Sequence, residues 1–236
     1  MSNPPTPIAI IGAGPAGMMA AEVLTDAGHA VDIYDAMPSV GRKFLMAGKS
    51  GLNITHAEGL DLFLSRYAGQ DQRLRDMVQG FTPHNIIRWM KDLGIEAHTG
   101  STGRIFPTMM KASPLLRAWL ARLQEKGVVI HTRHRWTGWD ERGALKFEGP
   151  DGPLTVAPTA AVFALGGASW KRLGSDGAWA DHFRKRQIPL RAFEPSNGGF
   201  LVDWTEHMKR EFAGAAVKAV RLTAEGGEGP VSTRSE

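Results

Sequence analysis

The chain has 236 residues, of which 42% are hydrophobic and 22% charged, proportions ordinary for a globular protein with one large or two small domains. It contains no cysteine, which excludes a disulfide scaffold, a thiolate zinc site and a dithiol active site. The net charge of +4 is spread along the chain without a basic tract, so no nucleic-acid partner is expected. With no signal peptide and no apolar run of membrane-spanning length, we expect a cytoplasmic protein without a membrane partner.

The N-terminal part of the chain carries a glycine-rich turn between an apolar strand and a helix. Residues 8–11 are all apolar, which predicts a buried parallel strand. Gly12, Gly14 and Gly17 follow in G-x-G-x-x-G spacing, and a helix is predicted from Met18 until it stops at Gly28. This order predicts a dinucleotide-binding site with the phosphates at the helix N-terminus, and it disfavours the alternative of a glycine turn without a ligand.

Each residue of this motif has a separate predicted role. Gly12 permits the tight turn off the strand, Gly14 lets a pyrophosphate approach the backbone, and Gly17 lets the helix pack close to the strand. A second strand over residues 30–35 ends in Asp35. Because an acid about 20 residues into this motif binds the adenosine ribose, Asp35 is the predicted ribose ligand.

Residues 36–56 are too rich in glycine and polar residues for a plain helix. Within them Gly-Lys-Ser at 48–50 resembles the end of a P-loop. The first glycine of that motif is replaced by Lys43, and no buried strand leads into it, so we exclude a P-loop nucleotidase. A ligand-binding loop and an ordinary connection remain, and the position after a nucleotide-binding unit favours the ligand-binding loop.

Helical periodicity dominates residues 60–127. Thr82-Pro83 and Ser113-Pro114 are helix start signals, and each predicted helix ends at a glycine. The apolar stripes of these helices predict core packing. We interpret residues 100–107 as a turn between the helices.

From residue 128 the apolar period changes to that of strands. The last of these is wholly apolar and ends in Gly166-Gly167, as is typical of a strand covered on both faces. His131 and His134 are expected to point to opposite faces of a strand, so no metal site is predicted. The predicted strands cover residues 128–130, 135–139, 144–147, 154–156 and 160–165, and the middle three form a β-meander.

The C-terminal part is predicted to begin a second domain. A short helix is expected near residues 178–186, and the pattern resets at Ile188-Pro189, so we place the domains at 1–187 and 188–236. Strands are predicted over residues 199–204 and 216–222. The tail from 225 to 236 has almost no apolar residue and is expected to be loose.

Four blocks of the chain together resemble one family, the HI0933-like flavoproteins, which are NAD(P)/FAD-dependent oxidoreductases with a glutathione-reductase-like FAD fold. The second block is highly specific, the first is generic, and the resemblance covers residues 6–222. It implies an α/β fold: a Rossmann-like FAD-binding domain with a β-meander and a helical insertion, plus the start of a second β-rich domain. The blocks are residues 12–17, 41–56, 103–107 and 164–170.

The resemblance also implies which residues bind FAD. The glycine motif would hold the pyrophosphate and Asp35 the ribose; Arg42 and Lys43 would lie over the phosphates or ribose. Ala47, Gly48 and Asn53 would approach the flavin, and Trp136 would contact adenine through its backbone. The full implied set is Gly12, Gly14, Ala16, Gly17, Asp35, Arg42, Lys43, Ala47, Gly48, Asn53, Trp136, Ala164, Gly166 and Gly167.

The sequence differs from the family pattern in two ways that affect the function we expect. Chains of the family are longer, so this one is expected to be a member with its second domain cut short. There is no second G-x-G-x-x-G for an NAD(P)H domain and no cysteine, so a disulfide reductase is disfavoured. His56, Arg104 and Ser169 are weak candidates for catalysis, and capping or loop hydrogen bonding is the favoured interpretation of each.

We therefore expect an FAD-dependent oxidoreductase that passes a hydride or electrons to a small-molecule substrate. Reduction of a C=C bond with NAD(P)H as donor is one concrete form of this activity. The alternative is a noncatalytic nucleotide-binding fragment. A simple NAD(P) dehydrogenase is disfavoured because the meander suits an FAD fold. Substrate, catalytic acid or base, and oligomeric state are left open by the sequence.

Overall fold

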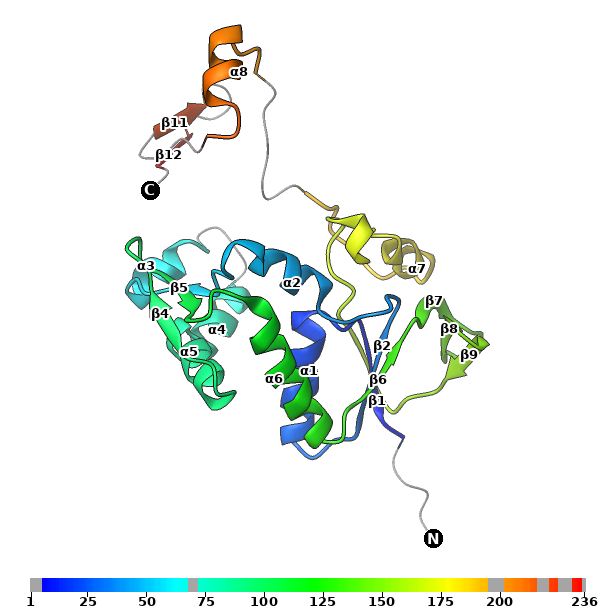
Figure 1. Ribbon diagram of the computed structural model, residues 1–236. Coiled ribbons are helices and arrows are strands. Elements are labelled where there is room, and N and C mark those ends of the chain that lie inside the picture. The colour runs from blue at the N-terminus through cyan, green and yellow to red at the C-terminus, as the bar shows by residue number, and fades with distance from the viewer. Residues whose placement is uncertain (1–5, 68–71, 195–201, 216–220, 225–230, 235–236) are drawn as a thin grey trace. The chain divides into compact units, whose positions relative to one another are not determined.

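The computed structural model describes residues 6–67, 72–194, 202–215, 221–224 and 231–234 (Figure 1). The contacts of the chain divide it into two units, residues 1–193 and residues 194–236. Each unit is described by itself. The domain boundary expected near residue 188 stays a prediction.

A four-stranded parallel sheet forms the centre of the first unit. Its strands lie in the order β10-β1-β2-β6, and all three pairings are parallel. The chain leaves β1 toward β2 on one side, while β10 pairs on the other side, so the strand order reverses between β1 and β10. Such a reversal opens a crevice at the carboxyl ends of the strands, where ligands bind in open α/β sheets; we call this side the carboxyl edge. The strands are β1 (Ile8–Ile11), β2 (Val31–Asp35), β6 (Val129–Thr132) and β10 (Ala161–Phe163).

Two helices cover one face of the sheet. Figure 1 shows α1 (Pro15–Asp26) and α6 (Ala112–Glu125) side by side there. Ile10 and Ile33 from the strands and Trp119 from α6 are at most 2% exposed in the core between these layers. Both helices begin earlier than the sequence predicts. In α1 the reason is Pro15, whose fixed φ suits the first helical position.

An antiparallel meander, which the sequence predicts, covers the opposite face of the sheet. It consists of β7 (Arg135–Trp139), β8 (Leu145–Gly149) and β9 (Gly152–Val156). Aromatic side chains fill the space between meander and sheet: Tyr34 stacks on Phe147 with ring centroids 4.5 Å apart. The short helix α7 (Trp179–Lys185), which follows the 3-10 helix η2 (Lys171–Leu173), packs against the same cluster.

A mixed insertion separates β2 from β6. The helix predicted from Thr82 is confirmed. The Thr82 hydroxyl accepts a hydrogen bond from the backbone N–H of Asn85, whose side chain accepts one from the N–H of Thr82, so the two residues form a capping box. The helices are α2 (Arg42–Ala47), η1 (Gly48–Ser50), α3 (Leu60–Ser65), α4 (Gln72–Gly80) and α5 (Pro83–Asp92).

Two parts of this insertion differ from the prediction. The polar stretch 36–56 contains the short helix α2 because Gly41, with φ of 62°, provides a left-handed start that a local helix pattern does not show. Residues 100–107 hold the strand β5 (Arg104–Pro107) and not only a turn. It is the middle strand of a small antiparallel sheet with β3 (Thr55–His56) and β4 (Ala97–Thr99). The pairing with β3 spans about 50 residues of the chain and leaves no local signature.

The prediction that His131 and His134 face opposite ways is wrong. Arg133 adopts a φ of 59° and turns the chain out of β6, so the two imidazole rings lie 5.6 Å apart and both contact Tyr34. No group of metal-binding side chains is found within the described ranges.

The second unit contains α8 (Glu206–Phe212) and the antiparallel pair β11 (Arg221–Ala224) and β12 (Val231–Arg234). The Thr205 hydroxyl caps α8 by accepting a hydrogen bond from the N–H of Met208 at 3.3 Å. This helix was not predicted from the sequence.

Three C-terminal predictions meet the described residues only in part. Of the strand predicted over 199–204, residues 202–204 are not a strand and the rest lie outside the described residues. The strand predicted over 216–222 is described only from 221. The tail expected to be loose includes β12. Among the described helices none combines the length and apolar character needed to cross a bilayer.

Candidate cofactor site

The first glycine turn lies at the carboxyl edge between β1 and α1, and its three glycines meet different surroundings. Gly12 has a φ of 109°, and a Cβ there would lie 2.4 Å from the carbonyl oxygen of Ala164. A Cβ on Gly17 would lie 1.9 Å from the carbonyl oxygen of Gly12, so α1 rests directly on the turn. A Cβ on Gly14 would meet no atom within 4 Å. Gly12 and Gly17 are thus required by the fold, whereas Gly14 borders open space.

Backbone donors converge on that open space. In the described part of the chain the N–H groups of Gly14, Ala16 and Gly17 have no hydrogen-bond acceptor, and Pro15 has no N–H. The first turn of α1 carries no acidic side chain. Free N–H groups at a helix N-terminus, with its partial positive charge, form an anion-binding site. The turn is therefore suited to a phosphate group.

Asp35, the predicted ribose ligand, is the last residue of β2 and is hydrogen-bonded to the first glycine turn. Its Oδ2 accepts a hydrogen bond from the N–H of Ala13 at 2.6 Å, and its Oδ1 accepts one from the N–H of Met37 at 2.8 Å. Each carboxylate oxygen retains a further lone pair, so the group can also accept from a hydroxyl. The structure thus places Asp35 beside the glycine turn.

The helix α2 begins at the same edge with two cationic residues, Arg42 and Lys43. The helix is tied to the glycine turn because the N–H of Gly41 donates to the carbonyl of Ala13 at 3.0 Å. Arg42 donates to the Ser39 hydroxyl at 3.1 Å, but its Nε is buried without a partner. Burial lowers the pKa of Lys43, and no carboxylate within the described residues pairs with it. Both cations are available to an anion.

A second glycine turn follows β10 and lies near Lys43. The N–H of Ala164 donates to the carbonyl of Ile11 at 2.8 Å, which holds the end of β10 beside the end of β1. Gly166 has a φ of 72°, and the position of a Cβ there is 3.8 Å from Nζ of Lys43. Gly167 borders open space as Gly14 does. The structure therefore brings both glycine turns, Asp35 and the start of α2 to one crevice.

The other predicted cofactor residues have different surroundings. Ala47 and Asn53 are exposed. Gly48 packs against the start of α6, since a Cβ there would lie 2.3 Å from the Cβ of Ala112. The Trp136 side chain lies in the aromatic core, 5.0 Å from the ring of Phe163, with its Nε1 buried and unpartnered. Their roles toward a cofactor stay predictions.

His56 is held by its loop in the way expected of a structural residue. Its Nε2 lies 3.0 Å from the carbonyl oxygen of Thr102, and its Nδ1 accepts from the N–H of Glu58 at 3.1 Å. Both ring nitrogens are therefore engaged in one neutral tautomer, with Nε2 as donor. Arg66, bonded to Glu58 through two nitrogens, lowers the pKa of that carboxyl. Arg104 and Ser169 are exposed.

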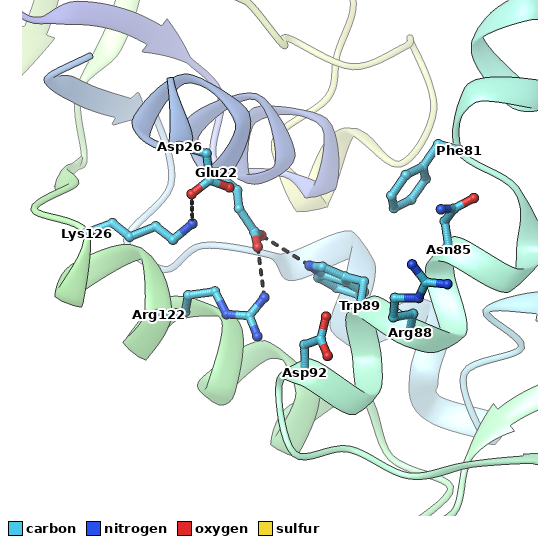
Figure 2. Close-up of a pocket in the computed structure, with 9 residues that line it drawn as sticks. All are labelled: Glu22, Asp26, Phe81, Asn85, Arg88, Trp89, Asp92, Arg122 and Lys126. Atoms are coloured by element: carbon cyan, nitrogen blue, oxygen red, sulfur yellow. Dashed lines mark hydrogen bonds and ion pairs between the residues drawn. The ribbon is translucent and has the colours of Figure 1, made fainter. Parts of the chain in front are cut away.

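A groove of about 500 Å³ lies elsewhere, along the second half of α1 (Figure 2). Glu22 is buried at its inner wall, where it accepts from Nε1 of Trp119 at 2.7 Å, from Nε1 of Trp89 at 3.1 Å and from Arg122 at 2.9 Å. Asp26 and Lys126 form an ion pair beside it. These bonds join α1, α5 and α6, so the charges of the groove serve the fold and not the cofactor crevice. The lining residues are Glu22, Asp26, Phe81, Asn85, Arg88, Trp89, Asp92, Arg122 and Lys126.

Tyr34, one residue before Asp35, has a strongly raised pKa. Its ring is 4% exposed between β2 and the meander and stacks on His131 with centroids 4.6 Å apart. Burial, and then the neighbouring Asp32 carboxylate, raise the pKa of Tyr34 to about 12. The phenol is therefore neutral at physiological pH and belongs to the core.

A parallel sheet with a switch point, a glycine turn and an antiparallel meander define this chain as a Rossmann-like domain. Its residues 6–225 match the family model of the HI0933-like protein Rossmann domain, and the chain belongs to that family.

Two curated relatives are both ribosomal RNA dihydrouridine synthases. The protein from Escherichia coli is 29% identical over 230 residues, covering 92% of this chain and 54% of the relative. The protein from Haemophilus influenzae is 31% identical over 98 residues, covering 41% of this chain and 24% of the relative. The chain thus spans at most about half the length of these relatives.

Solved structures share the fold at low sequence identity. A 3-ketosteroid-Δ4-(5α)-dehydrogenase from Rhodococcus jostii has a TM-score of 0.52 at 15% identity, covering 71% of this chain and 47% of that one. A flavocytochrome c3 fumarate reductase has a TM-score of 0.52 at 18% identity, covering 69% of this chain and 34% of that one. At these identities the likeness concerns the fold alone.

Proposed function

We propose that this chain is the FAD-binding part of a flavin-dependent reductase that saturates a C=C bond of its substrate. The observation that carries the proposal is that the backbone N–H groups of Gly14, Ala16 and Gly17 have no acceptor among the described residues and lie beside the start of α2. There Arg42 and Lys43 have no carboxylate partner within the same residues. A dianionic pyrophosphate needs such a set of donors and positive charge. Membership of the HI0933-like family supports FAD as the dinucleotide.

The residues at the carboxyl edge fit the parts of FAD. The first glycine turn would hold the pyrophosphate, and Asp35 would accept from the adenosine ribose through its remaining lone pairs. Lys43 and the second glycine turn would contact the cofactor from the opposite side of the crevice. When bound, the flavin supplies the hydride and electron chemistry, while the protein groups orient it and exclude competing reactions.

The substrate we propose is a uracil base of ribosomal RNA, which would become dihydrouridine. Support comes from the names of the two curated relatives. The net reaction adds two electrons and two protons across one ring C=C bond, and NAD(P)H is the proposed donor of the hydride. This proposal departs from the expectation that no nucleic acid binds, which rested on the absence of a basic tract. The net charge of +4 and pI of about 9.5 favour approach to RNA without such a tract.

FAD binding is tested by titrating the purified chain with FAD and following the visible spectrum and flavin fluorescence. We expect binding by the wild-type chain and its loss in Gly14→Val, because the valine side chain would fill the open space where the pyrophosphate is expected. Undiminished FAD binding by a folded Gly14→Val variant would contradict the assignment of the crevice.

Turnover is tested with ribosomal RNA that lacks dihydrouridine, NAD(P)H and the FAD-loaded chain. The expected product is a uridine that gains the mass of two hydrogen atoms, measured by mass spectrometry of nuclease digests. Flavin binding with no bleaching by NAD(P)H and no modified uridine would favour the alternative, a nucleotide-binding chain without activity of its own.

A further inference from the structure

Two side chains downstream of the second glycine turn hold its carbonyl groups. Nε1 of Trp179, in α7, donates to the carbonyl oxygen of Gly166 at 3.0 Å. The hydroxyl of Ser175, which is only 5% exposed, donates to the carbonyl oxygen of Gly167. Successive carbonyls of this turn are thus both directed toward the segment 175–179. Neither side chain belongs to the motifs that the sequence analysis identified.

The direction of the carbonyls determines the direction of the amides. A trans peptide is planar with its N–H opposite its C=O, and the described residues contain no cis peptide. The N–H groups of Gly167 and Ala168 share their peptide planes with the two held carbonyls, so they point away from Ser175 and Trp179. Neither N–H has an acceptor within the described ranges, and a Cβ on Gly167 would meet no atom within 4 Å.

The open side of the turn presents amide donors. Nζ of Lys43 lies near the turn, 3.8 Å from the Cβ position of Gly166, a position that Oγ of Ser175 borders at 2.9 Å. With the carbonyls held back, the N–H groups of Gly167 and Ala168 are offered to an oxygen atom of a ligand, an arrangement that resembles an anion-binding nest. If either peptide rotated, a carbonyl oxygen would face that ligand atom and repel it.

We propose that Ser175 and Trp179 are positioning residues for the cofactor. They fix the two peptide planes of the second glycine turn so that the N–H groups of Gly167 and Ala168 donate to an oxygen of FAD. The inference rests on the proposed binding of FAD, but it concerns residues outside every motif used to predict that binding.

The test compares variants that remove one donor each. Ser175→Ala deletes the hydroxyl, and Trp179→Phe deletes the indole N–H while keeping an aromatic ring against Phe183. Ser65→Ala and Trp89→Phe are matched controls, because Ser65 donates to the carbonyl of Leu62 and Trp89 donates to Glu22, both away from the crevice. FAD affinity is measured by flavin fluorescence, folding by thermal unfolding without FAD, and the Gly167 and Ala168 amide signals by NMR with and without FAD.

We expect Ser175→Ala and Trp179→Phe each to weaken FAD binding about tenfold, equivalent to about one lost hydrogen bond, and to reduce the FAD-induced shift of the two amide signals. The controls should bind FAD as the wild-type chain does. Wild-type affinity and amide shifts in both crevice variants would overturn the positioning role while leaving the proposed function intact. Absence of FAD binding in every protein, the wild type included, would overturn both.

Discussion

The two ends of helix α1 lie in opposite chemical environments. At its N-terminus three N–H groups lack acceptors within the described residues, and Arg42 and Lys43 have no acidic partner there. In its second half Glu22 accepts three hydrogen bonds and Asp26 pairs with Lys126. Buried polar groups are normally satisfied inside a fold. The unsatisfied end is therefore the one that we propose binds a ligand, and the satisfied end holds the helices together.

The largest effect is expected from substituting two glycines at the N-terminus of α1, one that packs against the turn and one that borders open space. Gly17→Ala should lower the free energy of unfolding by about 3 kcal/mol or more, because its Cβ would overlap the carbonyl oxygen of Gly12 and force backbone movement. Gly14→Ala should cost less than about 1 kcal/mol, the loss of a favourable N-cap residue, yet weaken FAD binding about tenfold. Urea unfolding and FAD titration measure both. Equal stability losses would contradict the division of roles.

The satisfied end of α1 is tested by Glu22→Ala. We expect a loss of about 3 kcal/mol in the free energy of unfolding, because two indole N–H groups and the Arg122 guanidinium lose their acceptor. FAD affinity should stay unchanged in the folded variant. A variant that keeps its stability but loses FAD would place the groove, and not the carboxyl edge, in the cofactor site.

Two neighbouring residues at the end of β2 also differ in their surroundings: Asp35 lies at the crevice, whereas Tyr34 is buried in the core. Because the pKa of Tyr34 is raised from 10.0 to about 12, its neutral form stabilises the fold fully below pH 10, and this contribution is lost as the pH rises to about 12. The loss amounts to up to about 2 kcal/mol. Urea unfolding between pH 9 and 12 should show it in the wild-type chain and not in Tyr34→Phe. Parallel pH profiles of the two proteins would contradict the burial of the phenol.

The smallest expected effect belongs to Lys43→Ala. FAD affinity should fall several-fold, with a weaker dependence of binding on salt, since one cation near the predicted phosphates is removed. Stability should change by less than about 0.5 kcal/mol because the side chain has no ion pair within the described residues. Lys91→Ala, which removes an exposed lysine in the last turn of α5, is the matched control. Equal affinity in both variants would remove Lys43 from the site.

Local sequence pattern determined the parts of this protein that depend on short-range backbone preferences. Three parts could be predicted in this way: the strand, glycine turn and helix at residues 8–26, the helix start capped by Thr82, and the meander. In each, the apolar residues and turn residues that form the pattern lie within a few positions of one another. The four motif blocks were sufficient to identify the family that the comparison shows.

Tertiary structure alone decided which groups face one another. Lys43 reaches Gly166, Ser175 and Trp179 hold the second glycine turn, and β5 pairs with β3, all across segments that no local pattern connects. A single positive φ at Arg133 brings together two histidines that strand alternation would separate. Such contacts depend on how the packed elements fill space, so the chemistry of the crevice becomes visible only once the sheet and its helices are assembled.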